Sequence, residues 1–312
     1  MSAPTQPQAA AAKAAPLGSL SRRCLLCAAW FVATGLLFLA PLSRFVSYAL
    51  SNDNASHAIL IPAIFIWILF LERRRIFVAL GSDLRSALLF FIPGCLASAV
   101  LFFSSSRLSE LNQLSLSILA LILLWISGFA FLFGRIALER ARFPLSFLLL
   151  TIPIPDFLLD KTIYFLQKGT TEIAAVLFDW SGVPVLRDGF VFHLARVNIE
   201  VARECSGIRS SLALIILAIL VAHFCLRTFW RQALLVLAGL FVMILKNAIR
   251  IVTLTLLASY VDPGFLYGNL HREGGVVFFL LGLVLLAPLL WWLERGERKL
   301  PLAAVAGQQS LP

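Results

Sequence analysis

Long apolar stretches separated by short polar segments run through most of the chain. A membrane-spanning helix needs about 20 mostly apolar residues in a row. By this measure the sequence predicts an all-α polytopic membrane protein with about eight transmembrane helices. The expected spans lie near residues 24–42, 58–72, 86–103, 112–133, 143–153, 206–226, 232–261 and 276–293.

Polar segments mark the ends of the membrane domain and its loops. Residues 1–21 are rich in Ala, Pro, Gln and Ser without a hydrophobic period, which predicts a disordered cytoplasmic tail. The apolar run that follows continues well past the length of a signal-peptide core, so we expect no cleavable signal. The transmembrane domain is therefore expected over 22–299, with a cytoplasmic C-terminal tail over 300–312. We expect an outer loop at 43–57 and an inner loop at 134–142.

The pattern changes between residues 157 and 204. Residues 157–180 are amphipathic, with charged and amide side chains between the apolar positions, which predicts an interfacial or re-entrant helix pair. Residues 190–201 alternate apolar and polar positions and contain β-branched residues, which predicts a short outer β-hairpin. This hairpin leads directly into Cys205.

Composition and charge agree with a membrane protein and set its orientation. The chain is 60% hydrophobic and 13% charged, whereas soluble domains average about 25% charged residues. Its net charge of +10 comes from 26 Lys and Arg against 16 Asp and Glu. We expect the excess on cytoplasmic loops, because such loops are enriched in basic residues. The expected partners therefore include membrane lipids and exclude nucleic acids, and both termini are expected to be cytoplasmic.

A dense polar segment at 203–211 interrupts this apolar background. Ionisable groups at the mouth of a membrane helix are expensive and usually functional. Cys205 is flanked by ionisable neighbours on both sides, and a helix N-terminus with nearby cations lowers the pKa of a thiol. We interpret Cys205 as a candidate nucleophile. The candidate supporting residues around it are Glu204, Ser206, Gly207 and Arg209.

Arg250 and His271 are the other candidates for catalysis at the same expected outer face. Arginine stays protonated, so Arg250 is suited to stabilising an oxyanion rather than to acting as a base. His271 is suited to acid–base work near neutral pH. Asn247 lies three residues before Arg250 and is a candidate support, and His57 opens a span on the same face. Alternatively, Cys205 is a small packing residue, Arg250 an interfacial residue and His271 part of a polar loop.

These residues resemble the exosortase/archaeosortase family of membrane cysteine transpeptidases. The resemblance rests on Glu204 to Ser210, on Asn247 to Arg250 and on His271, with weaker likeness at Ser56 to Pro62, where Ala58 replaces the family's usual Gly. It implies that Cys205, Arg250 and His271 are catalytic. It also implies a bacterial inner-membrane enzyme that cleaves a C-terminal sorting signal, typically with a Pro-Glu-Pro motif, on secreted proteins and passes them to a cell-surface acceptor.

Two other functions stay open on the sequence. One is an intramembrane cysteine protease that only hydrolyses its substrate. The other is a non-enzymatic transporter in which Lys246 and Arg250 line an anion path. The sequence shows no metal-binding cluster, phosphate loop or dinucleotide fingerprint, so we expect neither a metal nor a cofactor.

Overall fold

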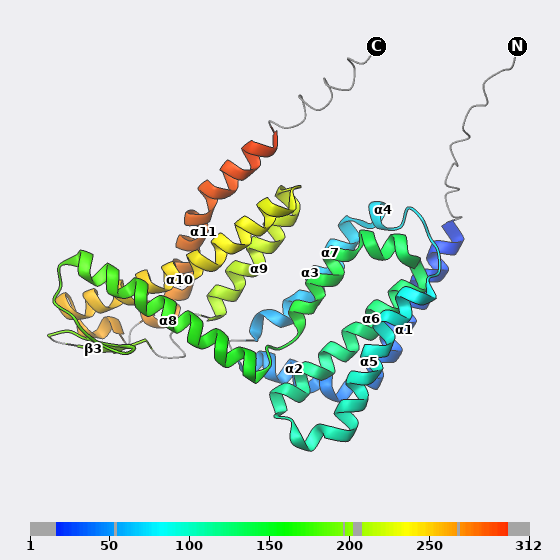
Figure 1. The fold of residues 1–312 in the computed structure, drawn as a ribbon, viewed down its shortest axis with the longest axis horizontal. Coiled ribbons are helices and arrows are strands. Elements are labelled where there is room, and N and C mark those ends of the chain that lie inside the picture. The colour runs from blue at the N-terminus through cyan, green and yellow to red at the C-terminus, as the bar shows by residue number, and fades with distance from the viewer. Residues whose placement is uncertain (1–16, 53–54, 196, 202–207, 267–268, 299–312) are drawn as a thin grey trace, which may run out of the picture. The chain divides into compact units, whose positions relative to one another are not determined.

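The computed structural model describes residues 17–52, 55–195, 197–201, 208–266 and 269–298. Among them, 17–19, 105, 208–210, 263, 266, 269–274 and 298 are described by their backbone alone. The chain divides into two compact units at Asp156, and Figure 1 labels the elements of both. The expected tails fall largely outside the described residues.

The described part of the first unit consists of helices. Helix α6 is its centre, because α1, α2, α4, α5 and α7 all contact it. The elements are α1 (Leu17–Leu37), α2 (Leu39–Ser51), η1 (Ser56–Ile59), α3 (Leu60–Leu71), α4 (Arg73–Ile76), α5 (Leu84–Ser104), η2 (Ser105–Arg107), α6 (Glu110–Arg140), α7 (Arg142–Leu148) and η3 (Leu149–Thr151).

Polar side chains within this helical unit bond to backbone carbonyls. The Ser127 hydroxyl donates to the Ala87 carbonyl at 2.9 Å, and the Trp30 indole donates to the Leu124 carbonyl at 2.9 Å. Such internal partners are needed where lipid offers none. A Cβ at Gly128 would lie 2.2 Å from Cδ1 of Trp30, so this glycine is what allows the indole to lie against α6.

The described part of the second unit combines four α-helices and one short 3-10 helix with a small sheet. Its three strands form an antiparallel sheet in the order β1-β2-β3, in which Phe192 pairs with Ile199. The Phe192 ring packs on Phe178 of α8, with ring centroids 5.1 Å apart. The elements are α8 (Asp156–Ser181), β1 (Leu186–Asp188), β2 (Val191–His193), β3 (Asn198–Glu200), α9 (Ile208–Cys225), α10 (Phe229–Tyr260), η5 (Pro263–Leu266) and α11 (Asn269–Arg298).

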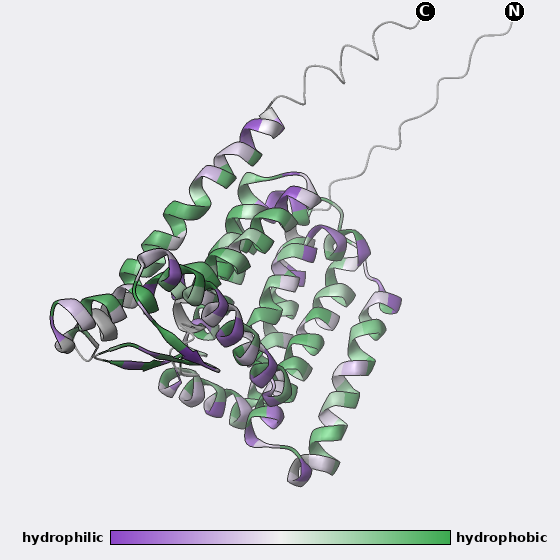
Figure 2. Cartoon of the chain, turned by 60° about the vertical axis from the view of Figure 1, so that its left-hand side comes forward, coloured by the Kyte–Doolittle hydropathy of each residue, from purple (hydrophilic) through white to green (hydrophobic). Residues whose placement is uncertain are grey.

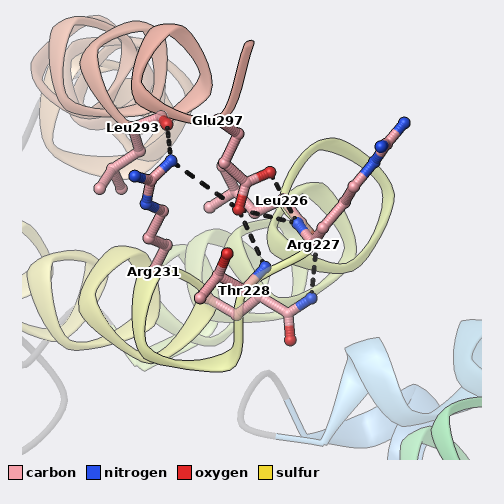
Figure 3. Close-up of polar contacts among 7 residues, drawn as sticks. Leu226, Arg227, Thr228, Arg231, Leu293 and Glu297 are labelled. Atoms are coloured by element: carbon pink, nitrogen blue, oxygen red, sulfur yellow. Dashed lines mark hydrogen bonds and ion pairs between the residues drawn. The ribbon is translucent and has the colours of Figure 1, made fainter. Parts of the chain in front are cut away.

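A carboxylate ties α9, α10 and α11 together at one end (Figure 3). Glu297 accepts hydrogen bonds from the backbone amides of Arg227, at 2.8 and 3.0 Å, and Thr228, at 2.9 Å. The Arg231 guanidinium lies 4.0 Å from the same carboxylate and donates to the Leu293 carbonyl at 3.0 Å. We call these residues the Glu297 cluster. It fixes the turn between α9 and α10 against the end of α11.

Five described helices are long and apolar enough to cross a membrane, so the membrane class is confirmed but the expected number of about eight spans is not. A sixth arises if 142–151 and 156–181 are one broken span. The expected spans at 58–72 and 206–226 coincide with shorter apolar helices, Ser56–Leu71 and Ser211–Cys225. Figure 2 shows hydrophobic residues along most of the long helices. The five are Leu20–Leu37, Leu84–Ser104, Glu110–Arg140, Phe229–Tyr260 and Gly275–Glu297.

Several expected loops are helical instead. Helix α2 runs through the expected outer loop as far as Ser51, and α6 continues to Arg140 across a break at Gly134, where φ is +81°. Residues 157–180 form one helix, α8, rather than a pair. The expected hairpin is present at β2 and β3, with β1 added. The errors share a cause: a drop in hydrophobicity shows where burial in lipid ends, whereas helical hydrogen bonds continue into polar surroundings.

Candidate functional site

The chain that approaches Cys205 is anchored at Val201. Its carbonyl accepts a hydrogen bond of 2.6 Å from the Gln167 side chain of α8, and its amide donates to the Phe190 carbonyl at 2.9 Å. Both Val201 and Gln167 are buried. Because a buried carbonyl without a partner is costly, this bond fixes the chain four residues before Cys205.

Most of the candidate polar segment lies outside the described residues. This applies to Glu204, Cys205, Ser206 and Gly207. Arg209 lies in the first turn of α9, where only the backbone is described. Helix α9 therefore begins three residues after Cys205. Free amides and the helix dipole at such an N-terminus favour a nearby anion.

Packing between α9 and α10 sets the level of Arg250. The two helices are antiparallel, and a Cβ at Gly239 would lie 3.4 Å from side-chain atoms of Ile215 and Ala218. Ile208 lies 7 and 10 residues before Ile215 and Ala218 on α9. Because the helices run in opposite directions, the same steps forward from Gly239 on α10 lead to residues 246–249. The first residue of α9 is thus level with the helical turn that ends at Arg250.

Helix α8 and the sheet support α10 at this level. Asn247 is buried, and its Nδ2 donates to Oγ1 of Thr170 on α8 at 3.3 Å. On the same stretch of α10, Ala248 and Ile251 pack in one apolar cluster with Phe192 of the sheet. Arg250 itself is half-buried. Asn247 therefore connects α10 to α8 through Thr170, one helical turn before Arg250.

Lys246 faces a different set of neighbours from Asn247. It is 1% exposed, and a Cβ at Gly282 of α11 would lie 3.4 Å from its Cδ and 3.1 Å from Leu214 of α9. The lysine stem therefore lies between α9 and α11, one helical turn from Arg250. The sequence suggests Lys246 only as a residue that would line an anion path in a transporter, and its place among the three helices follows from their packing.

The backbone of His271 lies in the first turn of α11 rather than in a loop. Helix α11 runs antiparallel to α10, and Gly282 is level with Lys246. The same counting places His271 level with Leu257, about 10 Å beyond Arg250 at 1.5 Å rise per residue. Arg250 and His271 are thus on the same end portion of α10 and α11, with the His271 side chain outside the described atoms.

His57 belongs to the first unit. It lies in η1, is half-buried, and its Nδ1 has no hydrogen-bond partner among the described residues. Sequence reasoning also missed Gln167, Thr170 and Val201 as parts of the site. The polar interruptions at Gln167 and Thr170 within an apolar helix were the available signal.

A comparison with known families identifies the family of this chain. The profile of the transmembrane exosortase family matches residues 47–288, which include the polar segment, α10 and the start of α11. Neither a curated protein nor a solved structure matches the chain. A match over most of the chain identifies its family, and we conclude that this chain is a member of the transmembrane exosortase family.

Proposed function

We propose that this protein is a membrane cysteine transpeptidase that cleaves a C-terminal sorting signal of secreted proteins and transfers them to a cell-surface acceptor. The observation that carries the proposal is the match to the exosortase family, which spans Cys205, Arg250 and His271. The packing of α9, α10 and α11 supports it, because the start of α9 is level with the turn that ends at Arg250.

The proposed reaction begins with the Cys205 thiolate. An ordinary cysteine has a pKa of about 8.5, and the start of a helix favours the anion. The thiolate attacks the carbonyl carbon of the scissile peptide bond, and Arg250 stabilises the resulting oxyanion. The intermediate collapses to a thioester while His271 gives a proton to the leaving amine. An acceptor nucleophile then attacks the thioester and releases the thiol.

The supporting residues have distinct proposed roles. Gly207 allows the substrate backbone to approach closely, while Glu204, Ser206 and Arg209 bind substrate or orient the thiol. Asn247 keeps α10 against α8 through Thr170 and so holds Arg250 in place. His57, in η1 of the first unit, is proposed as a further substrate-binding or supporting residue. We place the active site toward the outer face of a bacterial inner membrane, with both termini in the cytoplasm.

A processing assay tests this proposal. A secreted reporter with a Pro-Glu-Pro sorting signal is co-expressed with the wild-type protein, with Cys205→Ala or with Cys225→Ala. Cys225 is a free, exposed thiol at the opposite end of α9, so its variant controls for general effects of removing a thiol from this helix. We expect processing with wild type and Cys225→Ala and none with Cys205→Ala.

The mass of the new reporter C-terminus separates the alternatives. Added mass supports transfer, whereas a free carboxylate means a protease that only hydrolyses. Processing that persists with Cys205→Ala would exclude a covalent thioester. A transporter would tolerate Cys205→Ser but lose its transport with Arg250→Ala.

A further inference from the structure

A groove of about 480 Å³ opens in the first unit, away from the proposed catalytic residues in the chain. Helices α1 and α5 both pack against α6, and the groove is lined by residues of all three. The main lining residues are Leu26 and Trp30 from α1, Leu88 and Phe91 from α5, and Phe131 and Leu132 from α6. Its volume falls within the range of about 300–1,000 Å³ that is usual for sites of small ligands.

The groove offers almost no polar groups to an occupant. Its two polar side chains already have backbone partners, since Ser127 donates to the Ala87 carbonyl and the Trp30 indole to the Leu124 carbonyl. The rest of the lining is aliphatic or aromatic. An occupant is therefore held by apolar contact alone along this length.

Arginines gather at one end of the groove. Arg23 marks this end, because its guanidinium donates to the carbonyl of the lining residue Leu132 at 2.6 Å and to the carbonyl of Gly81. Arg22 is exposed and lies one turn before the lining residue Leu26 on α1. Arg85 is also exposed and lies in the first turn of α5, three residues before Leu88.

Two carboxylates share this end, and both have partners. Asp83 accepts hydrogen bonds from the Ser86 hydroxyl at 2.6 Å and from the backbone amides of Ser86 and Arg85, and these bonds lower the pKa of its carboxyl group. Glu139 pairs with Arg135 at 2.8 Å. Four arginines (22, 23, 85 and 135) thus stand against two carboxylates, which leaves a net positive end.

The dimensions select the kind of occupant. From Leu84 to Phe91, the lining of α5 extends about 10 Å at 1.5 Å per residue, a third of the roughly 30 Å hydrocarbon core. A second transmembrane helix needs the full thickness and a channel about 10 Å wide. An acyl chain needs neither the full thickness of the bilayer nor such a wide channel. The basic end favours an anionic headgroup, and basic residues near anionic lipid leaflets strengthen such binding.

We infer that the groove between α1 and α5 binds an acyl chain of an anionic phospholipid, whose phosphate lies against Arg22 and Arg85. Arg23 holds the floor of the headgroup site by its bonds to two carbonyls. The site lies on α1, α5 and α6 and is separate in sequence from Cys205, Arg250 and His271. The inference stands independently of the proposed transpeptidase activity.

Native mass spectrometry of the purified full chain tests the site. The protein in detergent is titrated with phosphatidylglycerol or with phosphatidylcholine of the same acyl chains. Each basic residue near anionic lipid strengthens binding about fivefold, so the double variant Arg22→Gln, Arg85→Gln should bind phosphatidylglycerol about 25-fold more weakly. Leu88→Trp should also weaken it by filling the groove. Inorganic phosphate at matched concentration should not compete, because it lacks the acyl chain.

Matched variants control for general effects. Leu89→Trp adds the same ring at a neighbouring exposed position that does not line the groove, and Arg142→Gln removes an exposed arginine from the start of α7. Both should bind phosphatidylglycerol as wild type does. Equal retention of the two lipids by wild type, or unchanged binding by the double arginine variant, would mean ordinary surrounding lipid and overturn the site. Competition by phosphate alone would overturn the acyl-chain assignment.

Discussion

At the scale of single residues, the bond between Gln167 and Val201 connects α8 to the chain that approaches Cys205. It is short, at 2.6 Å, and buried on both sides. The two residues are far apart in the sequence, so no local sequence pattern predicts their hydrogen bond. The bond matters because of its position: Cys205, the proposed nucleophile, follows four residues after the bonded Val201 carbonyl.

We therefore expect Gln167→Leu to lower processing of a sorting-signal reporter while the protein still folds. Leucine fills similar space but leaves the Val201 carbonyl without its donor, at a cost of about 1–3 kcal/mol. Hydrogen exchange should become faster in residues 190–201. Gln232→Leu is the control, because Gln232 makes a similar bond of 2.7 Å to the Leu226 carbonyl at the other end of α9. Equal exchange in 190–201 for both variants would contradict the anchoring role.

At the scale of elements, close packing of α9, α10 and α11 sets the level of the candidate residues. Gly239 and Gly282 are the contact points, and each leaves room for side chains of a neighbouring helix. Small residues at such crossings let membrane helices approach closely. A shift of α9 along α10 would move the start of α9 away from Arg250.

Gly282→Leu should consequently lower both thermal stability and processing. The new side chain meets Leu214 and Lys246, and overpacking of this kind typically costs about 1–3 kcal/mol. Gly275→Leu is the matched control on the same helix, because a Cβ there meets no described atom within 4 Å. Thermal unfolding in detergent, read beside the reporter assay, measures both effects. If Gly275→Leu lowered thermal stability and processing more than Gly282→Leu, the relative level of α10 and α11 would not be the cause of the loss.

At the scale of the whole molecule, the basic loops predict which side of the membrane each element faces. The arginines at 73–75 are expected in the cytoplasm and the sheet around Asp188 outside. Cys24, Cys27, Cys95, Cys205 and Cys225 are first replaced by serine, and Arg74→Cys or Asp188→Cys is then added. A membrane-impermeant thiol reagent applied to intact cells should label Asp188→Cys and leave Arg74→Cys unlabelled. The reverse labelling would invert the orientation.

The sequence was informative where one property decides the structure. Hydrophobicity alone located the long helices α5, α6 and α10, and alternation located the strands β2 and β3. It misjudged where helices end, as at α2 and α6, because a helix does not stop where lipid does. It also left open which way Lys246 and Asn247 face. Adjacent residues on a helix point in directions about 100° apart, and the packing of the neighbouring helices decides which of them each side chain faces.

The distance along α10 between Arg231 and Arg250 indicates how deep in the membrane Arg250 lies. Arg231, in the Glu297 cluster, and Arg250 are about 28 Å apart along the helix at 1.5 Å rise per residue, close to the roughly 30 Å of a hydrocarbon core. If Arg231 marks one boundary of that core, Arg250 lies at the other. The proposed peptide cleavage beside Arg250 would then take place in the headgroup layer, and a large polar acceptor would reach the proposed thioester without a channel through the protein.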